Sequence, residues 1–147
     1  MATDPKTGQQ IFGGSTGAGL NNVGSYQVSG ISFATGSIDS ITNGLFKITF
    51  PYVTSWIYVV NHDQSNHCRV GFSSNGVDSG TNYFRLGPQA GNEATQFSQK
   101  LDLKLSELYL SGSTSVDVVA GLTTIPTARV DNISLSGSNW SGSLGVG

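Results

Sequence analysis

The chain has 147 residues, which is enough for one domain with a hydrophobic core of its own. Hydrophobic residues make up 37% of it and aromatic residues 10%, and this composition excludes a chain that is disordered throughout. Charged residues make up only 11%, against roughly 25% in a typical soluble protein. The seven basic residues are scattered singly and form no patch that could neutralise phosphates, so we expect no nucleic-acid partner.

The low charge and the 20 glycines predict a neutral surface made of small side chains. Charge normally keeps monomers apart, so such a surface is poorly protected from self-association. We therefore expect partners to cover much of the surface in an assembly. The alternative is a secreted or weakly charged β protein.

Cys68 is the single cysteine, so the chain cannot form an internal disulfide. The absence of disulfides favours assembly in a reducing cell interior over a secreted scaffold. The first residues, MATDPKTGQQIF, lack the apolar stretch of a signal peptide, and no run reaches the length of a membrane span. We expect no signal peptide, no transmembrane segment and no membrane partner.

The chain divides into three zones. Residues 1–23 form a Gly-rich polar N-terminal arm, residues 24–127 carry nearly all of the periodic apolar pattern, and residues 128–147 form a Gly/Ser-rich C-terminal arm. Neither arm can bury enough apolar surface to order itself, so both are expected to be flexible in the isolated protein. Each nevertheless carries large apolar residues, which a plain spacer does not need, and we expect these to bind neighbouring subunits: Ile11, Phe12, Leu20, Ile133, Leu135 and Trp140.

The middle zone begins with short apolar segments that alternate as strands do. Tyr26–Val28 opens the pattern. Ile31 and Phe33 continue it two residues apart, so both would point to the same face of a strand. In residues 45–50 the apolar side chains alternate with polar ones, which indicates a half-buried strand. Pro51 ends that strand because it cannot donate a hydrogen bond.

Residues 53–60 have apolar side chains at both odd- and even-numbered positions, and these point to opposite faces of a strand. The pattern predicts a central strand covered on both faces. The polar stretch 61–67 is expected to be a loop that joins this strand to the strand at 68–72 as a hairpin. Asn75-Gly76 and Ser79-Gly80 mark turns ahead of a short strand at 83–86.

The segment 97–110 is open to two interpretations. Leu101, Leu103 and Leu105 alternate with polar residues as in a strand. Leu101, Leu105 and Leu108 also fit one stripe of a helix, and the segment is rich in good helix formers. We predict a strand with a bulge near residues 106–107, where the parity changes, and keep the helix as the alternative.

A last strand at 116–122 brings the number to about eight, with no helix predicted. The predicted fold is therefore all-β, a single antiparallel β-sandwich of jelly-roll type between two flexible arms. The predicted core comprises Phe46, Ile48, Phe50, Ile57, Val59, Val70, Phe72, Leu103, Leu105, Val118 and Ala120.

The densest group of potential metal ligands or nucleophiles is His62, Asp63, His67 and Cys68. Its spacing matches no established metal or catalytic pattern, and a loop of Asn, Asp and Ser is what turn formation selects. The run of residues 13–19 resembles a phosphate-binding loop in composition but lacks its lysine. We expect no catalytic residue, no metal and no cofactor.

Carboxylates and aromatic residues offer two further kinds of site. The candidate carboxylates lie outside any motif, and surface solvation is the expected role of Asp63, Asp78, Glu93, Asp102, Glu107 and Asp117. Trp56 and Tyr58 share one strand face, as in a carbohydrate-binding platform, although burial in the core is the stronger expectation for both.

The run FPYVTSWIYVVNHDQSNHCRVGFSSNGVDSGTNYFRL, followed by SVDVVAGLT, resembles small virion proteins of tailed bacteriophages. In those proteins a strand of the type ITFPxVTxxIxVxN leads into xRVGFSxxGV and NYFxL. The resemblance covers roughly residues 24–123 and consists of strand and turn residues. It implies a jelly-roll decoration or minor capsid protein that binds the outside of a head lattice, often as a trimer.

The function expected from the sequence is therefore structural and not enzymatic. The chain would bind copies of itself and the major capsid protein or another virion protein, in a particle assembled in the host cytoplasm. Two alternatives stay open: another virion element, such as a tail, fibre or vertex module, and a β-sandwich domain that binds a glycan.

Overall fold

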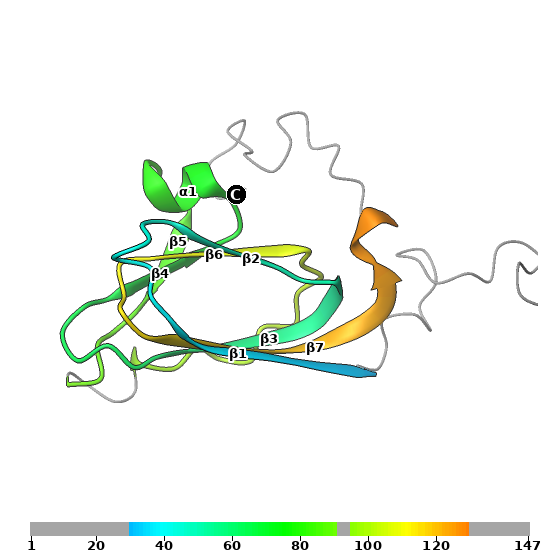
Figure 1. The fold of residues 1–147 in the computed structure, drawn as a ribbon, viewed down its shortest axis with the longest axis horizontal. Helices are drawn as coiled ribbons and strands as arrows, with labels where there is room; N and C mark the ends of the chain where they lie inside the picture. The colour runs from blue at the N-terminus through cyan, green and yellow to red at the C-terminus, as the bar shows by residue number, and fades with distance from the viewer. Residues whose placement is uncertain (1–29, 91–94, 130–147) are drawn as a thin grey trace, which may run out of the picture.

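A computed structural model describes residues 30–90 and 95–129. These residues form two antiparallel β-sheets that pack face to face, and Figure 1 shows the sheets as two layers. The all-β sandwich predicted from the sequence is thereby confirmed. The six residues of the arms that were expected to bind partners lie outside the described residues.

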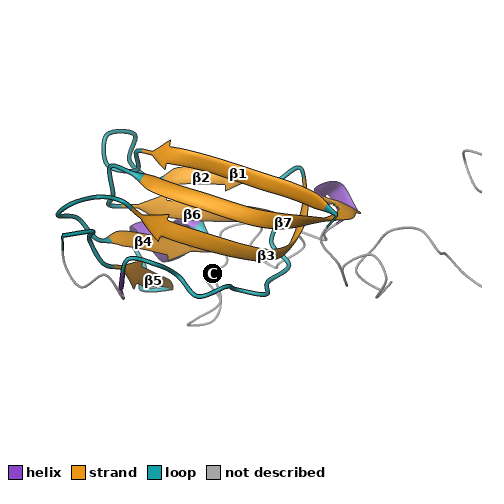
Figure 2. Cartoon of the chain, turned by 90° about the horizontal axis from the view of Figure 1, so that it is seen from below, coloured by secondary structure: helices purple, strands orange, loops and turns teal. Residues whose placement is uncertain are grey.

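Within residues 30–90 and 95–129, seven strands make up the two layers. The three-stranded sheet has the order β1-β7-β3 and comprises β1 (Ile31–Ile38), β7 (Val116–Pro126) and β3 (Tyr52–Asn61). Figure 2 shows β7 between its two neighbours. The four-stranded sheet has the order β2-β6-β4-β5 and comprises β2 (Phe46–Thr49), β6 (Glu107–Ser111), β4 (Cys68–Gly71) and β5 (Tyr83–Leu86).

The hairpin predicted between residues 53–60 and 68–72 is wrong. β3 and β4 belong to different sheets, and the loop 62–67 crosses from one layer to the other. β3 pairs instead with β7, with Asn61 opposite Val116 and Ile57 opposite Ala120. Spacing along the chain indicates where strands lie but leaves open whether neighbours in sequence are neighbours in a sheet.

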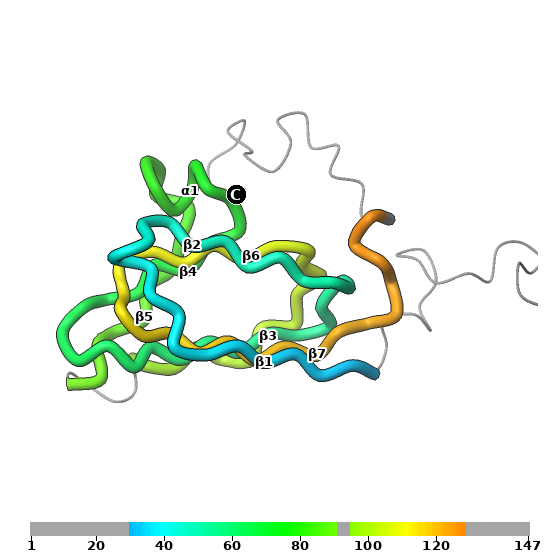
Figure 3. The backbone as a smooth tube through the Cα atoms, viewed as in Figure 1, coloured from blue at the N-terminus to red at the C-terminus, as the bar shows by residue number. Residues whose placement is uncertain are grey.

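The segment 97–110 forms a strand only at its end, in β6. Figure 3 shows the preceding stretch running along the lower layer before it rises to the upper one. It hydrogen-bonds β3 at intervals: Ile57 and Leu101 exchange two backbone bonds of 2.9 Å each, and Ser98 N–H donates to the Val59 carbonyl at 2.8 Å. The predicted strand is therefore wrong before β6, where only isolated bridges at Phe97 and Leu101 join the segment to β3, and the helical alternative is wrong as well.

The core lies between the two sheets. Most of the residues predicted for it are almost completely buried, among them Phe50, Ile57 and Val118. Phe46, Phe72 and Leu105 are partly buried against this core. Leu103 is also partly exposed, because its segment lies at the open side of the sandwich.

One helical turn, α1 (Ser74–Asp78), replaces the turn expected at Asn75-Gly76. The Ser73 hydroxyl caps it by accepting a 3.0 Å bond from the Gly76 N–H. The turn places Val77, which is fully buried, over Gly71 of β4, where any side chain would occupy the same space. A short 3₁₀ turn, η3 (Thr127–Arg129), follows β7.

Candidate functional site

The outer face of the three-stranded sheet carries a group of partly exposed apolar side chains. In the register of this sheet Tyr58 lies opposite Val119, and Trp56 lies opposite Gly121. Side chains alternate along a strand, so the neighbours of buried Ile57 and Val59 point outward. Trp56 and Tyr58 are half-buried there and do not belong to the core, contrary to the stronger expectation from the sequence.

Phe97 extends this face beyond β3. It lies opposite Val60 through an isolated bridge, and its ring stacks on Tyr58 with centroids 6.5 Å apart. Phe97 is 44% exposed and Val119 39%. We call the surface formed by Trp56, Tyr58, Val60, Phe97 and Val119 the apolar face.

The sheet under the apolar face is almost without charge. Within β1, β3 and β7, all of them described strands, Asp117 is the single charged residue. Its carboxylate lies 3.0 Å from His62 Nε2 and accepts a 2.8 Å bond from the Ser37 N–H. The shorter strands of the other sheet carry Lys47, Arg69, Arg85 and Glu107.

The structure separates the potential metal ligands of the crossing loop. His62 pairs with Asp117, whereas His67 is exposed on the loop. Among the described residues, no three His, Cys, Asp or Glu side chains lie close enough together to hold a metal ion.

Asp63 is buried and serves as the hydrogen-bond centre of the crossing loop. One carboxylate oxygen accepts from the backbone N–H groups of Ser65 and Asn66, each at 2.9 Å. The other accepts from the Thr114 N–H at 2.8 Å and the Thr114 hydroxyl at 2.6 Å. Burial raises the pKa of Asp63, but the bonds from Thr114, Ser65 and Asn66 outweigh burial and hold that pKa well below its usual value. Its role is to join the loop after β3 to the loop after β6.

Cys68 lies fully buried at the start of β4. Burial raises the pKa of its thiol to about 12, so the thiol is protonated at neutral pH. A buried, protonated thiol is a poor nucleophile and a poor metal ligand, and Cys68 acts as a small core residue.

The candidate carboxylates for paired chemistry lie in separate surroundings. Asp102 pairs with Lys100 at 3.2 Å, and Glu107 pairs with Lys47 of the neighbouring strand. Asp78 is exposed at the end of α1, and Glu93 lies outside the described residues.

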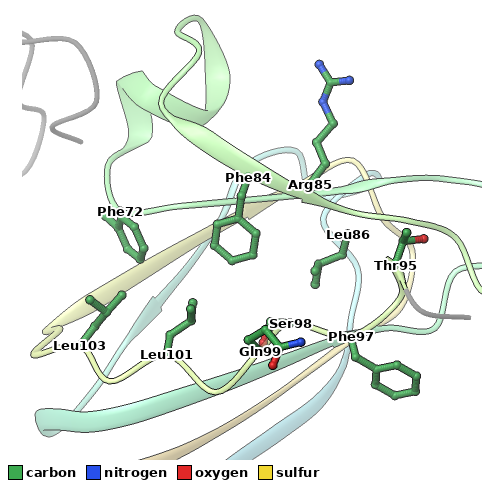
Figure 4. A pocket seen from close by; sticks show the side chains of 10 residues that line it. All are labelled: Phe72, Phe84, Arg85, Leu86, Thr95, Phe97, Ser98, Gln99, Leu101 and Leu103. Atoms are coloured by element: carbon green, nitrogen blue, oxygen red, sulfur yellow. The ribbon is translucent and has the colours of Figure 1, made fainter.

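A cavity of about 530 Å³ opens between the sheets at the side where β5 faces the segment 95–103. Figure 4 shows Phe72, Phe84 and Leu86 pointing into it from one sheet, and Leu101 and Leu103 from the opposite side. The Arg85 side chain points away from it. Its described lining is mostly apolar, and such a slot can accept an apolar group. Of these residues the sequence predicts Phe72 and Leu103 as core, because alternation shows which way a side chain points but not whether another element covers it.

No family model, curated protein or solved structure matches the chain. No helix among the described residues is long and apolar enough to cross a membrane.

Proposed function

We propose that this chain is a structural protein of a virion, a decoration or minor capsid protein that stabilises a head shell through contacts between subunits. The observation that carries the proposal is the nearly uncharged three-stranded sheet with its apolar face. A monomer in solution gains solubility from charged side chains on its sheet faces. A face with one charge, itself paired, suits burial against another protein.

The strand order supports a jelly-roll description. If the segment 97–101 is counted as a strand beside β3, the sandwich has two sheets of four strands each. The chain then changes sheet at every connection except the one between β4 and β5, as in two Greek keys folded together. Jelly rolls are common in viral capsid and lectin domains, so this topology agrees with the proposal.

We assign a second copy of this chain as the occupant of the apolar face. Two like faces whose single charge, Asp117, is paired with His62 meet with little repulsion about a symmetry axis, and a sheet face packs readily against another sheet face. The half-exposed aromatic rings of Trp56, Tyr58 and Phe97 are of the residue types that dominate interface energies. Association through this face leaves the other sheet free for the shell.

The oligomeric state of the purified chain tests this assignment. Phe97→Ser and Val119→Ser combined remove two exposed apolar side chains without opening the core. Ile41→Ser is the matched control, because Ile41 is also 44% exposed but lies in the loop after β1. By size-exclusion chromatography with light scattering, we expect oligomers for the wild type and the control, and monomers for the double variant. A monomeric wild type at all concentrations, or a double variant that oligomerises as the wild type does, would contradict the assignment.

Mass spectrometry of purified particles tests the placement in a virion. Hundreds of copies per particle would indicate a decoration protein, and about a dozen would indicate a vertex or tail element, since copy number follows the symmetry of the site. Absence from the particles would contradict the proposal. Trp140→Ala tests the contribution of the C-terminal arm, and we expect it to weaken attachment without changing the melting temperature.

Carbohydrate binding is the second candidate, favoured by the half-exposed Trp56 and Tyr58 on one face. Sugars stack on aromatic rings displayed in this way. Titration calorimetry with a panel of soluble glycans, repeated with Trp56→Ala, separates the two candidates. A monomeric protein that binds a glycan through Trp56 would favour the second.

A further inference from the structure

A second surface lies on the outer face of the four-stranded sheet, where two arginines stand side by side. Arg69 of β4 and Arg85 of β5 are directly opposite one another in the register of these strands, and both are exposed. Like charges at directly opposed positions of an antiparallel pair destabilise it. In a chain with only seven basic residues, this pairing needs a physical reason.

Neither arginine has a carboxylate partner among the described residues. The ion pairs in this part of the chain join Lys47 to Glu107, His62 to Asp117, and Lys100 to Asp102. Both guanidinium groups are therefore left with a net positive charge that the described part of the protein does not balance.

Tyr83 holds the two guanidinium groups in place. The Cζ atoms of Arg69 and Arg85 lie 5.0 Å and 5.5 Å from the centroid of its ring, and Arg85 Nη2 donates to the Tyr83 hydroxyl at 3.2 Å. Cation–π contacts of this kind restrict the side chains without neutralising them. The hydrogen bond from Arg85, with the charges of both arginines, lowers the pKa of Tyr83.

The two arginines line a concave site of about 470 Å³, which we call the arginine pocket. Ser111 of β6 lies opposite Arg69, and Asn66 and His67 contribute from the loop that precedes β4. Gly112 completes it in a left-handed conformation, with φ of +90°, where a Cβ would meet the His67 carbonyl at 2.9 Å. The other end of this sheet face is covered by α1, so the pocket is confined to one end.

We propose that the arginine pocket binds an oxyanion, a carboxylate, phosphate or sulfate group that bridges Arg69 and Arg85. Each guanidinium presents parallel N–H donors that match the oxygens of such a group, and the anion would replace their repulsion by two charge-assisted interactions. The neutral donors of Ser111 and Asn66 add hydrogen bonds at the wall. The group can belong to an acidic side chain of a partner protein or to a free or sugar-linked anion, since the chemistry recognised is the same.

Thermal unfolding of the full chain in sodium phosphate against sodium chloride of equal ionic strength is the first test. We expect phosphate to raise the melting temperature of the wild type in a saturable manner, because a ligand that binds only the folded state stabilises it. Arg69→Gln and Arg85→Gln should abolish this response, and each should leave the melting temperature in chloride equal or higher because the repulsion is removed. Lys100→Gln is the matched control for loss of one positive charge and should respond as the wild type does.

Titration calorimetry with phosphate, sulfate and acetate then identifies the favoured group, and a short poly-glutamate peptide tests the side-chain source. We expect at least tenfold weaker binding in either arginine variant and weaker binding in Tyr83→Phe, which loses the hydroxyl that holds Arg85. Binding of any of these probes that depends on both arginines supports the proposal. The absence of binding to all four, or equal binding by the wild type and the arginine variants, overturns it.

Discussion

Replacing Asp63 with asparagine is expected to destabilise the domain by about 3 kcal/mol at neutral pH. The wild-type carboxylate accepts bonds from the Ser65 and Asn66 N–H groups on one oxygen, and from the N–H and hydroxyl of Thr114 on the other. An asparagine has one oxygen, so its NH₂ group must face the donors on one of the two sides. If it faces Thr114, the Thr114 N–H loses its acceptor, which costs roughly 1–3 kcal/mol, and the charge-assisted bonds lost from the other donors add to this.

The loss should also depend on pH in a defined direction. The pKa of Asp63 is lower in the folded protein than the value near 3.9 of an unfolded chain. Its contribution is therefore complete above the unfolded value and is lost as the pH falls through the folded one. The difference in stability between the wild type and Asp63→Asn should be largest at pH 7 and should shrink below about pH 4.

Urea unfolding followed by circular dichroism at pH 7 and at about pH 3 measures both effects. Thr114→Val is the control, because it removes only the hydroxyl bond and should cost about 1 kcal/mol. If Asp63→Asn were as stable as the wild type at pH 7, or if the difference were equal at the two pH values, the hydrogen-bonded carboxylate would not hold the two loops together.

Three further predictions concern the core. Ile57 is fully buried, so Ile57→Ala should cost roughly 2–5 kcal/mol in urea unfolding, and a silent substitution would contradict its place between the sheets. Gly71→Ala would overlap the Val77 side chain and should cost about 1–3 kcal/mol; addition of Val77→Ala should recover part of that loss, and full stability of the single variant would show that α1 does not cover this position. Cys68, buried and with a raised thiol pKa, should resist alkylation at pH 8 until urea unfolds the chain, whereas rapid modification of the folded protein, detected by mass spectrometry, would place it at the surface.

The positions of several strands, and which of their side chains point inward, can be predicted from the sequence alone. Alternation in residues 45–50 and 116–122 indicates strands whose inward side chains, such as Ile48 and Val118, are buried as expected. Alternation depends only on the two-residue repeat of an extended chain, so it can be recognised without knowledge of the neighbouring strand. The low charge is likewise a property of composition, and composition alone predicts a surface poorly protected from self-association.

Tertiary structure decided which strands pair and which faces are covered. Nothing in the loop 62–67 distinguishes a hairpin from a crossing, because the crossing loop is held by hydrogen bonds that Thr114, 51 residues away, donates to Asp63. Similarly, the half-exposure of Trp56 and Tyr58 on the apolar face reflects the absence of a covering element among the described residues.

The arginine pocket is likewise a product of the tertiary structure. Nothing in the sequence sets Arg69 and Arg85 apart from other charged residues. The register of β4 with β5 places them opposite each other. Periodicity along a chain determines the direction of each side chain, whereas the neighbours it meets are determined by pairing between distant segments. The all-β character could therefore be predicted, and both surfaces proposed for binding required the fold.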